Sequence, residues 1–489
     1  MHRTSPVRLA PLVVLALVAC GDNLAPPGDP FGGQPDPFAA QPDTSEGLTN
    51  VSADLAALLE GGTLTTACVE AAAAPADRTL RLRCGKALFF YEGFATAGVP
   101  APLVRWLLDG FPAELGPGFA ALGMIPDPFS DAGLPLGLAP GGAAFGDVPT
   151  FAFTCASCHV AQLADGRYAV GAPNHAFAYG TLNLAFSVLP ALVIPGADPA
   201  DHDPAAIAAL QPLRDRLAAE PALGTALLTA LLPLIESGAM LPPFSVENEH
   251  HYAGWRAGTM DFFIQPLPID DEVHTISKIS ALWGIPSDAE LTRHALGSAM
   301  LGWTGGTGHL ATFVTSFVEL GGGDLTPWPA DRLAPLVEYV ESLRAPAPST
   351  APAAAQVTRG QAVFGAACLT CHGGPRGMGD RVYGFDEIGT DAAIQWWADG
   401  PEHDGELCCG LTLRAGDAIT HGLKSPRLVG LDHMTRFLHN GALDSLEQLL
   451  CLEPRPGVTE LAYGDAGHEA GCELPASDRR ALLAFLRAQ

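Results

Sequence analysis

The chain has 489 residues, of which 48% are hydrophobic and 16% charged, and its formal net charge is −27. This composition excludes a disordered polyelectrolyte, and the length suffices for two or more domains with hydrophobic cores. A nucleic-acid-binding protein is disfavoured, because an acidic chain offers no basic face to neutralise phosphates. The negative charge suits solubility or a cationic protein partner.

The N-terminal segment 1–20 has the pattern of an export signal. His2, Arg3 and Arg8 form a positive start, and the apolar run 9–19 is too short to span a bilayer as a helix. The run ends Leu-Val-Ala-Cys20, which resembles the bacterial lipobox and predicts lipidation of Cys20. An ordinary signal peptide with an incidental cysteine is the alternative. We therefore expect a periplasmic or cell-envelope protein, lipid-anchored at Cys20, with the choice of inner or outer membrane open.

The rest of the chain divides by composition. Residues 21–50 are rich in Gly, Pro and Asp and predict a flexible tether. We expect an N-terminal domain over 51–344, an Ala/Pro/Ser/Thr-rich linker over 345–356 and a C-terminal domain over 357–489. The most apolar later segment, Ala222 to Ile235, is short for a membrane span and contains a proline.

Two C-x-x-C-H motifs carry the strongest chemical signal. They are Cys155-Ala-Ser-Cys158-His159 and Cys368-Leu-Thr-Cys371-His372. In this spacing two thiols reach the two vinyl groups of one porphyrin edge, and the adjacent histidine ligates the iron. Thioredoxin-like redox pairs and a four-cysteine zinc site are the alternatives, but neither explains a histidine after both pairs. The motifs therefore predict two covalently bound haem c groups, with His159 and His372 as iron ligands.

Six further cysteines remain besides Cys20, an even number that predicts disulfides in an oxidising compartment. They are Cys68, Cys84, Cys408, Cys409, Cys451 and Cys472. Six cysteines allow fifteen connectivities, and the sequence does not choose among them. Proximity alone favours Cys68 with Cys84 and Cys451 with Cys472.

A short pattern precedes each haem motif. Gly85-Lys-Ala-Leu-Phe89 is similar to Gly360-Gln-Ala-Val-Phe364, and the apolar helical pattern of 329–343 is similar to that of 477–486. The C-terminal copy resembles class I cytochromes c, in which a glycine on the first helix lets the last helix cross closely. We therefore predict a mainly α fold with two cytochrome c-type haem domains, of which the N-terminal one has large insertions.

The segment 423–447 resembles the stretch around the second haem of bacterial di-haem cytochrome c peroxidases. It contains an apolar-His-Asn-Gly turn at 438–441, followed by Ser-Leu-Glu at 445–447. His439 matches the histidine of that turn, which implies a distal ligand or pocket residue at the second haem. Met434 is the competing candidate, because thioether ligation is common in cytochromes c.

Three other segments resemble the same family, namely 84–90, 171–174 and 302–306. Trp303 matches an aromatic residue that lies between the haems and helps electrons pass, although Thr304 stands where the family usually has Asp. A core aromatic is the alternative for Trp303. His175 follows the first haem motif at the distance of the displaceable histidine that caps the reactive haem, and a loop histidine is the alternative.

Peroxide cleavage also needs an acid–base group. The candidates are Glu319 and His309, which follow Trp303 at a suitable distance in the sequence. The alternative for each is a solvent-exposed helix residue. The family often holds Ca²⁺ between its domains and often forms homodimers. No oxygen-ligand motif in this sequence supports Ca²⁺ independently.

Three functions follow as hypotheses. The resemblance implies a peroxidase-like oxidoreductase that reduces hydrogen peroxide with electrons relayed from haem 2 to haem 1. The donor would be a small protein such as a monohaem cytochrome c or a cupredoxin. The wide motif spacing is closer to the related di-haem rubber oxygenases, which implies oxygen chemistry on an apolar substrate, with 222–235 lining the pocket. A pure electron carrier is disfavoured, since it needs little more than about a hundred residues per haem.

Overall fold

A computed structural model describes the greater part of the chain. The described residues are 45–46, 64–96, 98–127, 130, 133–142, 148–164, 166–236, 246–260, 275–287, 301–320, 323, 330–379, 381–396 and 419–489. The predicted signal peptide with Cys20, nearly all of the predicted tether, and Cys408 and Cys409 lie outside these residues.

Helices dominate the regular structure, which agrees with the predicted mainly α class. The helices are α3 (Leu64–Ala73), α4 (Arg78–Tyr91), α5 (Ala101–Gly110), α6 (Pro112–Leu115), α7 (Cys155–His159), α8 (Tyr179–Ala191), α9 (Pro204–Ala209), α10 (Gln211–Ala219), α11 (Pro221–Glu236), α12 (Val246–Gly254), α14 (Leu310–Leu320), α15 (Ala330–Ser342), α16 (Ala354–Ala367), α17 (Leu369–His372), α18 (Phe385–Ile388), α20 (Leu446–Leu449) and α21 (Ala476–Arg487). Among the described residues, no helix is long and apolar enough to cross a membrane.

The strands are short and form small antiparallel sheets, with orders β1-β6-β5, β2-β4-β3, β7-β8 and β9-β10. They are β1 (Ser45–Glu46), β2 (Val99–Pro100), β3 (Leu138–Pro140), β4 (Thr150–Phe153), β5 (Val160–Gln162), β6 (Tyr168–Val170), β7 (Thr259–Met260), β8 (Ser277–Lys278), β9 (Val382–Gly384) and β10 (Gly422–Lys424). β4 runs into α7, and β5 follows it directly. The N-terminal C-x-x-C-H motif therefore lies between strands of two different sheets, since β4 pairs with β2 and β3 and β5 pairs with β6.

One end of the predicted tether belongs to the fold. β1 pairs with β6, with Ser45 opposite Ala169 and Glu46 opposite Tyr168. The edge of β6 offers backbone groups that need partners, and an extended segment satisfies them. The prediction of a tether through residue 50 is therefore corrected for these two residues.

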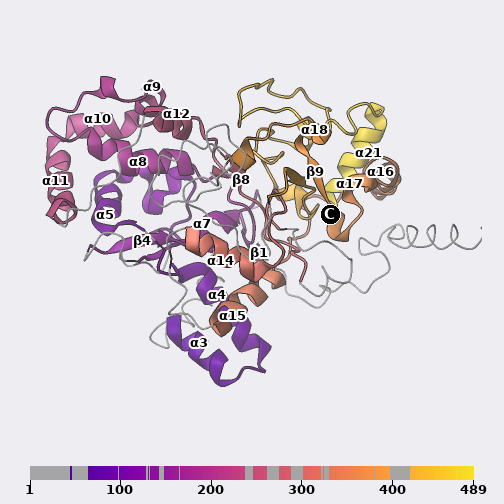
Figure 1. The fold of residues 1–489 in the computed structure, drawn as a ribbon, viewed down its shortest axis with the longest axis horizontal. Helices are drawn as coiled ribbons and strands as arrows, with labels where there is room; N and C mark the ends of the chain where they lie inside the picture. The colour runs from indigo at the N-terminus through magenta and orange to yellow at the C-terminus, as the bar shows by residue number, and fades with distance from the viewer. Residues whose placement is uncertain are drawn as a thin grey trace, which may run out of the picture.

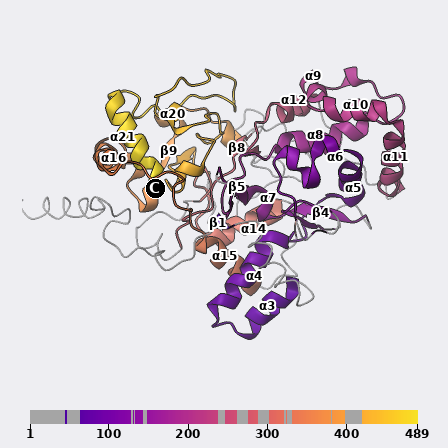
Figure 2. The same ribbon diagram turned by 180° about the vertical axis from the view of Figure 1, so that it is seen from behind.

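The two predicted pairs of crossing helices are confirmed. α4 packs on α15, and α16 packs on α21, as both ribbon views show (Figures 1 and 2). A Cβ atom at Gly85 would overlap the Pro335 carbonyl and lie 2.6 Å from Cβ of Tyr339. At Gly360 a Cβ atom would overlap the Ala481 carbonyl in the same manner. Each glycine thus permits a close crossing that a larger residue would block.

An arginine–carboxylate pair joins the helices at each crossing. Arg81 Nε donates to Glu338 Oε2 across 2.7 Å, between α4 and α15. Arg359 Nε donates to Asp478 Oδ1 across 2.9 Å, between α16 and α21. The pairs are partly exposed, so they fix the register of the helices more than they stabilise them.

The segments between α4 and α15 build a separate helical lobe. α8 to α12 gather with α5 on the side of the molecule opposite α16 and α21 (Figures 1 and 2). α11, which contains the apolar segment 222–235, packs against α5 in this lobe. A second hydrophobic cluster surrounds α4, α7 and α15, and a third lies around α16, α20 and α21.

Candidate haem-binding cavity

Each C-x-x-C-H motif forms a short helix, which follows a strand in the N-terminal part of the chain and another helix in the C-terminal part. α7 begins after Thr154, whose Oγ1 donates to the Phe90 carbonyl across 3.0 Å. This hydrogen bond ties the N-terminal motif to α4. α17 follows α16 directly, with the Cys368 amide bonded to the Phe364 carbonyl across 2.8 Å. Each motif is thus attached to the first helix of its crossing pair.

The motif cysteines are free, whereas the other described cysteines form disulfides. Disulfides join Cys68 to Cys84 and Cys451 to Cys472, so both predicted pairings are confirmed. The free cysteines are Cys155, Cys158, Cys368 and Cys371. The four thiols of the two motifs therefore remain available for covalent attachment.

The electrostatics of these thiols differ from those of redox-active pairs. Burial raises the pKa of Cys155 to about 12, and the neighbouring Cys158 adds to this effect. Burial also raises the pKa of Cys158 and of Cys368 to about 11. Thioredoxin-like pairs have a thiol whose pKa is lowered instead. A thioredoxin-like function is therefore disfavoured for the N-terminal motif.

Metal sites made only of protein ligands are also disfavoured. Within the described part of the chain, no group of three or more His, Cys, Asp or Glu residues is arranged to hold a metal ion. The two cysteine pairs therefore do not combine into a four-cysteine zinc site there. The same finding assigns no Ca²⁺ site to the described residues.

The two motif histidines differ in the hydrogen bonds of their ring nitrogens. His372 Nδ1 lies 2.6 Å from the Gly377 carbonyl oxygen. A carbonyl only accepts, so Nδ1 carries the proton and Nε2 keeps its lone pair. His159 Nδ1 is buried and has no hydrogen-bond partner. Burial lowers the pKa of both histidines to about 4, which keeps the imidazoles neutral.

A single cavity of about 770 Å³ joins the two motifs. All four motif cysteines, His159 and His372 line it, and the greater part of its surface is apolar. Apolar side chains of α14 form part of the wall, among them Phe313 and Phe317, whose ring centroids lie 4.8 Å apart. A large apolar cavity with two sets of paired thiols and neutral imidazoles fits two porphyrins.

Three basic side chains lie in the cavity wall, of which the two lysines are buried and the arginine is half-buried. They are Lys278, Lys424 and Arg427. Burial lowers the pKa of each lysine to about 7 and that of the arginine to about 10. Among the described residues, no carboxylate forms an ion pair with any of the three. Buried cations without a counter-charge are costly, and the propionate carboxylates of haem would compensate them.

Trp303 lines this cavity and is fixed by the two lysines. Its Nε1 donates to the Lys278 carbonyl across 3.2 Å, and its carbonyl accepts from the Lys424 amide across 2.9 Å. The Lys278 ammonium lies 5.2 Å from the centroid of the indole ring, within cation–π distance. Trp303 therefore shares the wall of one cavity with both motifs, and its place between two haems stays a prediction.

The predicted distal ligands divide into two groups. His439 and Met434 line the cavity. The His439 carbonyl accepts from the Lys278 amide across 2.7 Å, and burial lowers the pKa of its imidazole. Met434 packs at the border of the second and third hydrophobic clusters. His175, by contrast, is absent from the cavity wall.

Both ring nitrogens of His175 form hydrogen bonds. Nε2 lies 3.1 Å from the Ile279 carbonyl and donates to it, and Nδ1 accepts from the Thr435 amide across 3.2 Å. The imidazole therefore joins the loop after the first motif to the C-terminal part of the chain. His175 therefore has the position of the alternative stated above, a loop histidine held by hydrogen bonds within the protein.

We expect His175 to make the protein sensitive to acid. Burial, helped by the nearby cation of Lys278, lowers its pKa to about 3, whereas the unfolded chain takes up this proton near pH 6.5. The contribution to stability is complete above about pH 6.5 and is lost as the pH falls towards 3, by up to about 1.4 kcal/mol per pH unit. Urea unfolding of His175→Gln at several pH values should give a slope smaller by about one proton.

The wild-type protein, unfolded in urea at the same pH values, provides the reference slope. An unchanged slope in His175→Gln would show that this histidine titrates alike in the folded and unfolded chains.

The candidate acid–base residues lie elsewhere. His309 precedes α14 and Glu319 lies near its end, and both side chains are exposed. Neither lines the cavity, because the apolar face of α14 is the one turned towards it. The described residues of α11 do not line it either, so the expectation that segment 222–235 forms the pocket wall is corrected.

Sequence reasoning missed four residues of the wall. Lys278, Lys424 and Arg427 lie in or next to short strands, and a lysine inside an apolar run was the available signal. The fourth, His468, lies in an irregular loop with Gly467 as its only marker. Comparison with known proteins adds no relative: no family model, curated protein or solved structure matches this chain.

Proposed function

We propose that this chain is a c-type cytochrome that binds two haem groups covalently and acts as a peroxidase-like oxidoreductase. The observation that carries the proposal is the common cavity, which is lined by the free thiols and neutral histidines of both motifs and by Trp303. The resemblance of the sequence to di-haem cytochrome c peroxidases supports the same function.

The residues of the cavity would have separate roles in holding the haem groups. The thiols of each motif would hold one haem, and His159 and His372 would ligate the irons. When bound, a haem supplies an iron that gains and loses one electron. Lys278, Lys424 and Arg427 would pair with the propionates, and the apolar wall would keep water away from the site.

Electrons would enter at the C-terminal motif and pass the indole of Trp303 on their way to the N-terminal motif. Reduction of hydrogen peroxide to two water molecules takes two electrons and two protons. The acidic chain suits a cationic small donor protein. We also propose an envelope location with a lipid anchor at Cys20, as the N-terminal sequence predicts.

The test is peroxide-dependent oxidation of a reduced monohaem cytochrome c by the haem-loaded protein. Trp303→Ala should lower the turnover at least about tenfold, which is about 1.4 kcal/mol in the activation free energy. Trp303→Phe keeps an aromatic ring and should retain most of the activity. Haem content and the unfolding midpoint should match the wild type in both variants.

A second candidate is an oxygen-dependent oxidation of an apolar substrate. It is favoured by the apolar wall that α14 contributes and by the exposed positions of His309 and Glu319, which leave the cavity without the predicted acid–base groups. Oxygen uptake on addition of polyisoprene, without peroxide-dependent oxidation of the donor, would select this function and reject the first.

A further inference from the structure

A second imidazole stands opposite His372 in the cavity. The ring centroids of His372 and His468 lie 6.2 Å apart, with 63° between the ring planes. Both residues line the cavity. Among the described residues, no other histidine ring makes a ring contact with His372.

The distance fits two ligands of one metal. A ligating imidazole nitrogen lies about 2 Å from its metal, and the ring centre lies about 1 Å behind that nitrogen. Two imidazoles on opposite sides of one ion therefore have centroids roughly 6 Å apart. The observed separation of 6.2 Å matches this spacing.

The Nδ1 atoms of the two imidazoles differ in their hydrogen bonds. His372 uses Nδ1 to donate to the Gly377 carbonyl, which leaves Nε2 as the nitrogen that can ligate a metal. Nδ1 of His468 is buried and has no hydrogen-bond partner.

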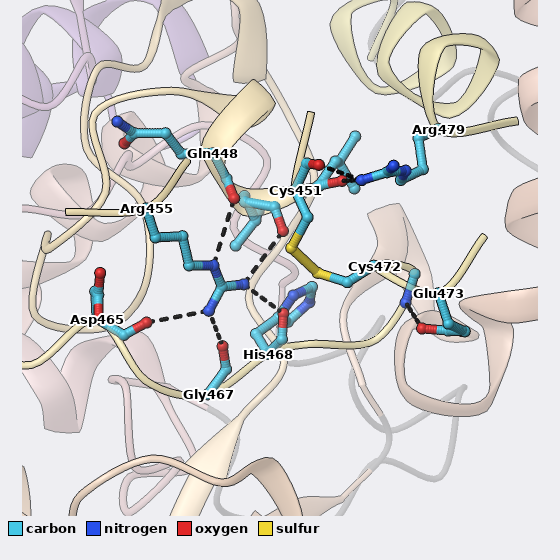
Figure 3. Close-up of a disulfide and its surroundings, with 12 residues drawn as sticks. Gln448, Cys451, Arg455, Asp465, Gly467, His468, Cys472, Glu473 and Arg479 are labelled. Atoms are coloured by element: carbon cyan, nitrogen blue, oxygen red, sulfur yellow. Dashed lines mark hydrogen bonds between the residues drawn. A yellow bond between two sulfur atoms is a disulfide. The ribbon is translucent and has the colours of Figure 1, made fainter. Parts of the chain in front are cut away.

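The loop that carries His468 is held by contacts within the protein. The guanidinium of Arg455 donates to the carbonyls of Asp465, Gly467 and His468 across 3.0, 2.8 and 3.0 Å (Figure 3). The Cys451–Cys472 disulfide closes the base of the same region (Figure 3). The position of His468 is therefore fixed by the chain itself.

We propose that His468 is the sixth ligand of the haem bound at Cys368 and Cys371. The inference rests on the proposed function and deepens it, because an iron with two histidine ligands transfers electrons and is closed to peroxide. Substrate chemistry is then confined to the haem at the N-terminal motif. The second haem has two nitrogen ligands and therefore a lower reduction potential than one with a methionine ligand.

The test uses the full-length, haem-loaded protein and its electron paramagnetic resonance spectrum. His468→Ala should convert one low-spin ferric haem to high spin, and added imidazole should restore the low-spin signal. His468→Met should stay low-spin and raise the reduction potential of that haem. His439→Ala, Met434→Ala and the exposed-site control His421→Ala should leave the second haem low-spin.

The outcomes separate the two proposals. Fewer than two haems in the wild-type protein would reject the proposed function itself. Two haems in His468→Ala with an unchanged low-spin spectrum would overturn the ligand assignment. If the alanine variant does not fold, the methionine variant decides, since an unchanged reduction potential of both haems would exclude His468 as a ligand.

Discussion

Replacement of Cys368 and Cys371 by alanine should reduce the covalently bound haem from two groups per chain to one. These thiols are free and line the cavity, and they would form the thioether bonds to the second porphyrin. His372 alone would hold a haem only by coordination, which denaturation breaks. The measurement is the mass of the denatured chain, together with haem absorbance per chain after complete unfolding.

A double variant at the Cys451–Cys472 disulfide is the matched control for thiol loss. Cys451→Ala with Cys472→Ala removes two cysteines from the same part of the chain but should leave two covalent haems. The free energy of unfolding should instead fall by about 3 kcal/mol, because the disulfide closes a loop of this size. Two covalent haems in the Cys368/Cys371 variant would reject this motif as an attachment site.

Gly360→Ala should destabilise the C-terminal domain by about 1–3 kcal/mol or more, because the added methyl group would overlap the Ala481 backbone. The carbonyl belongs to the main chain of α21, so relief requires the two helices to move apart. Urea unfolding followed by circular dichroism measures the loss. Gly85→Ala should have a similar effect at the crossing of α4 and α15, where the Pro335 carbonyl is the obstacle.

The same helix contains its own control. Gly365 also lies in α16, but no heavy atom would lie within 4 Å of a Cβ atom there. Gly365→Ala should therefore stabilise the helix by about 0.5–1 kcal/mol through reduced backbone entropy. Equal effects of the two substitutions would show that the crossing is looser than the structure indicates.

Features of the fold that depend on local pattern were predictable from the sequence. The glycines at 85 and 360 mark the crossing helices because a similar pattern precedes each C-x-x-C-H motif, with Phe364 four residues before Cys368 and Phe89 66 residues before Cys155. The two disulfides followed from cysteines close together in the sequence, since short separations make such contacts probable. The helical lobe was foreseen only as an insertion of unspecified shape.

The residues of the site were predictable where they are neighbours in the sequence, as in the two C-x-x-C-H motifs. His468 was not, because the contact that singles it out joins it to a residue far away in the sequence. His175 is the opposite case, a histidine that the sequence offered as a ligand candidate. It is buried and near the cavity cations, as a ligand would be, but hydrogen bonds to Ile279 and Thr435 occupy both nitrogens. Burial and residue type alone do not distinguish these two histidines.

The two glycine crossings differ in how they bear on the order of folding. The partners of Gly360 lie roughly 120 residues along the chain, whereas those of Gly85 lie roughly 250 residues away, beyond the whole helical lobe. Doubling a loop adds only about 0.6 kcal/mol to its closure cost, but the intervening lobe must also collapse before α15 can return to α4. The part of the chain that is synthesised last should therefore fold first. An unfolded N-terminal C-x-x-C-H motif would then stay accessible for longer than the C-terminal one.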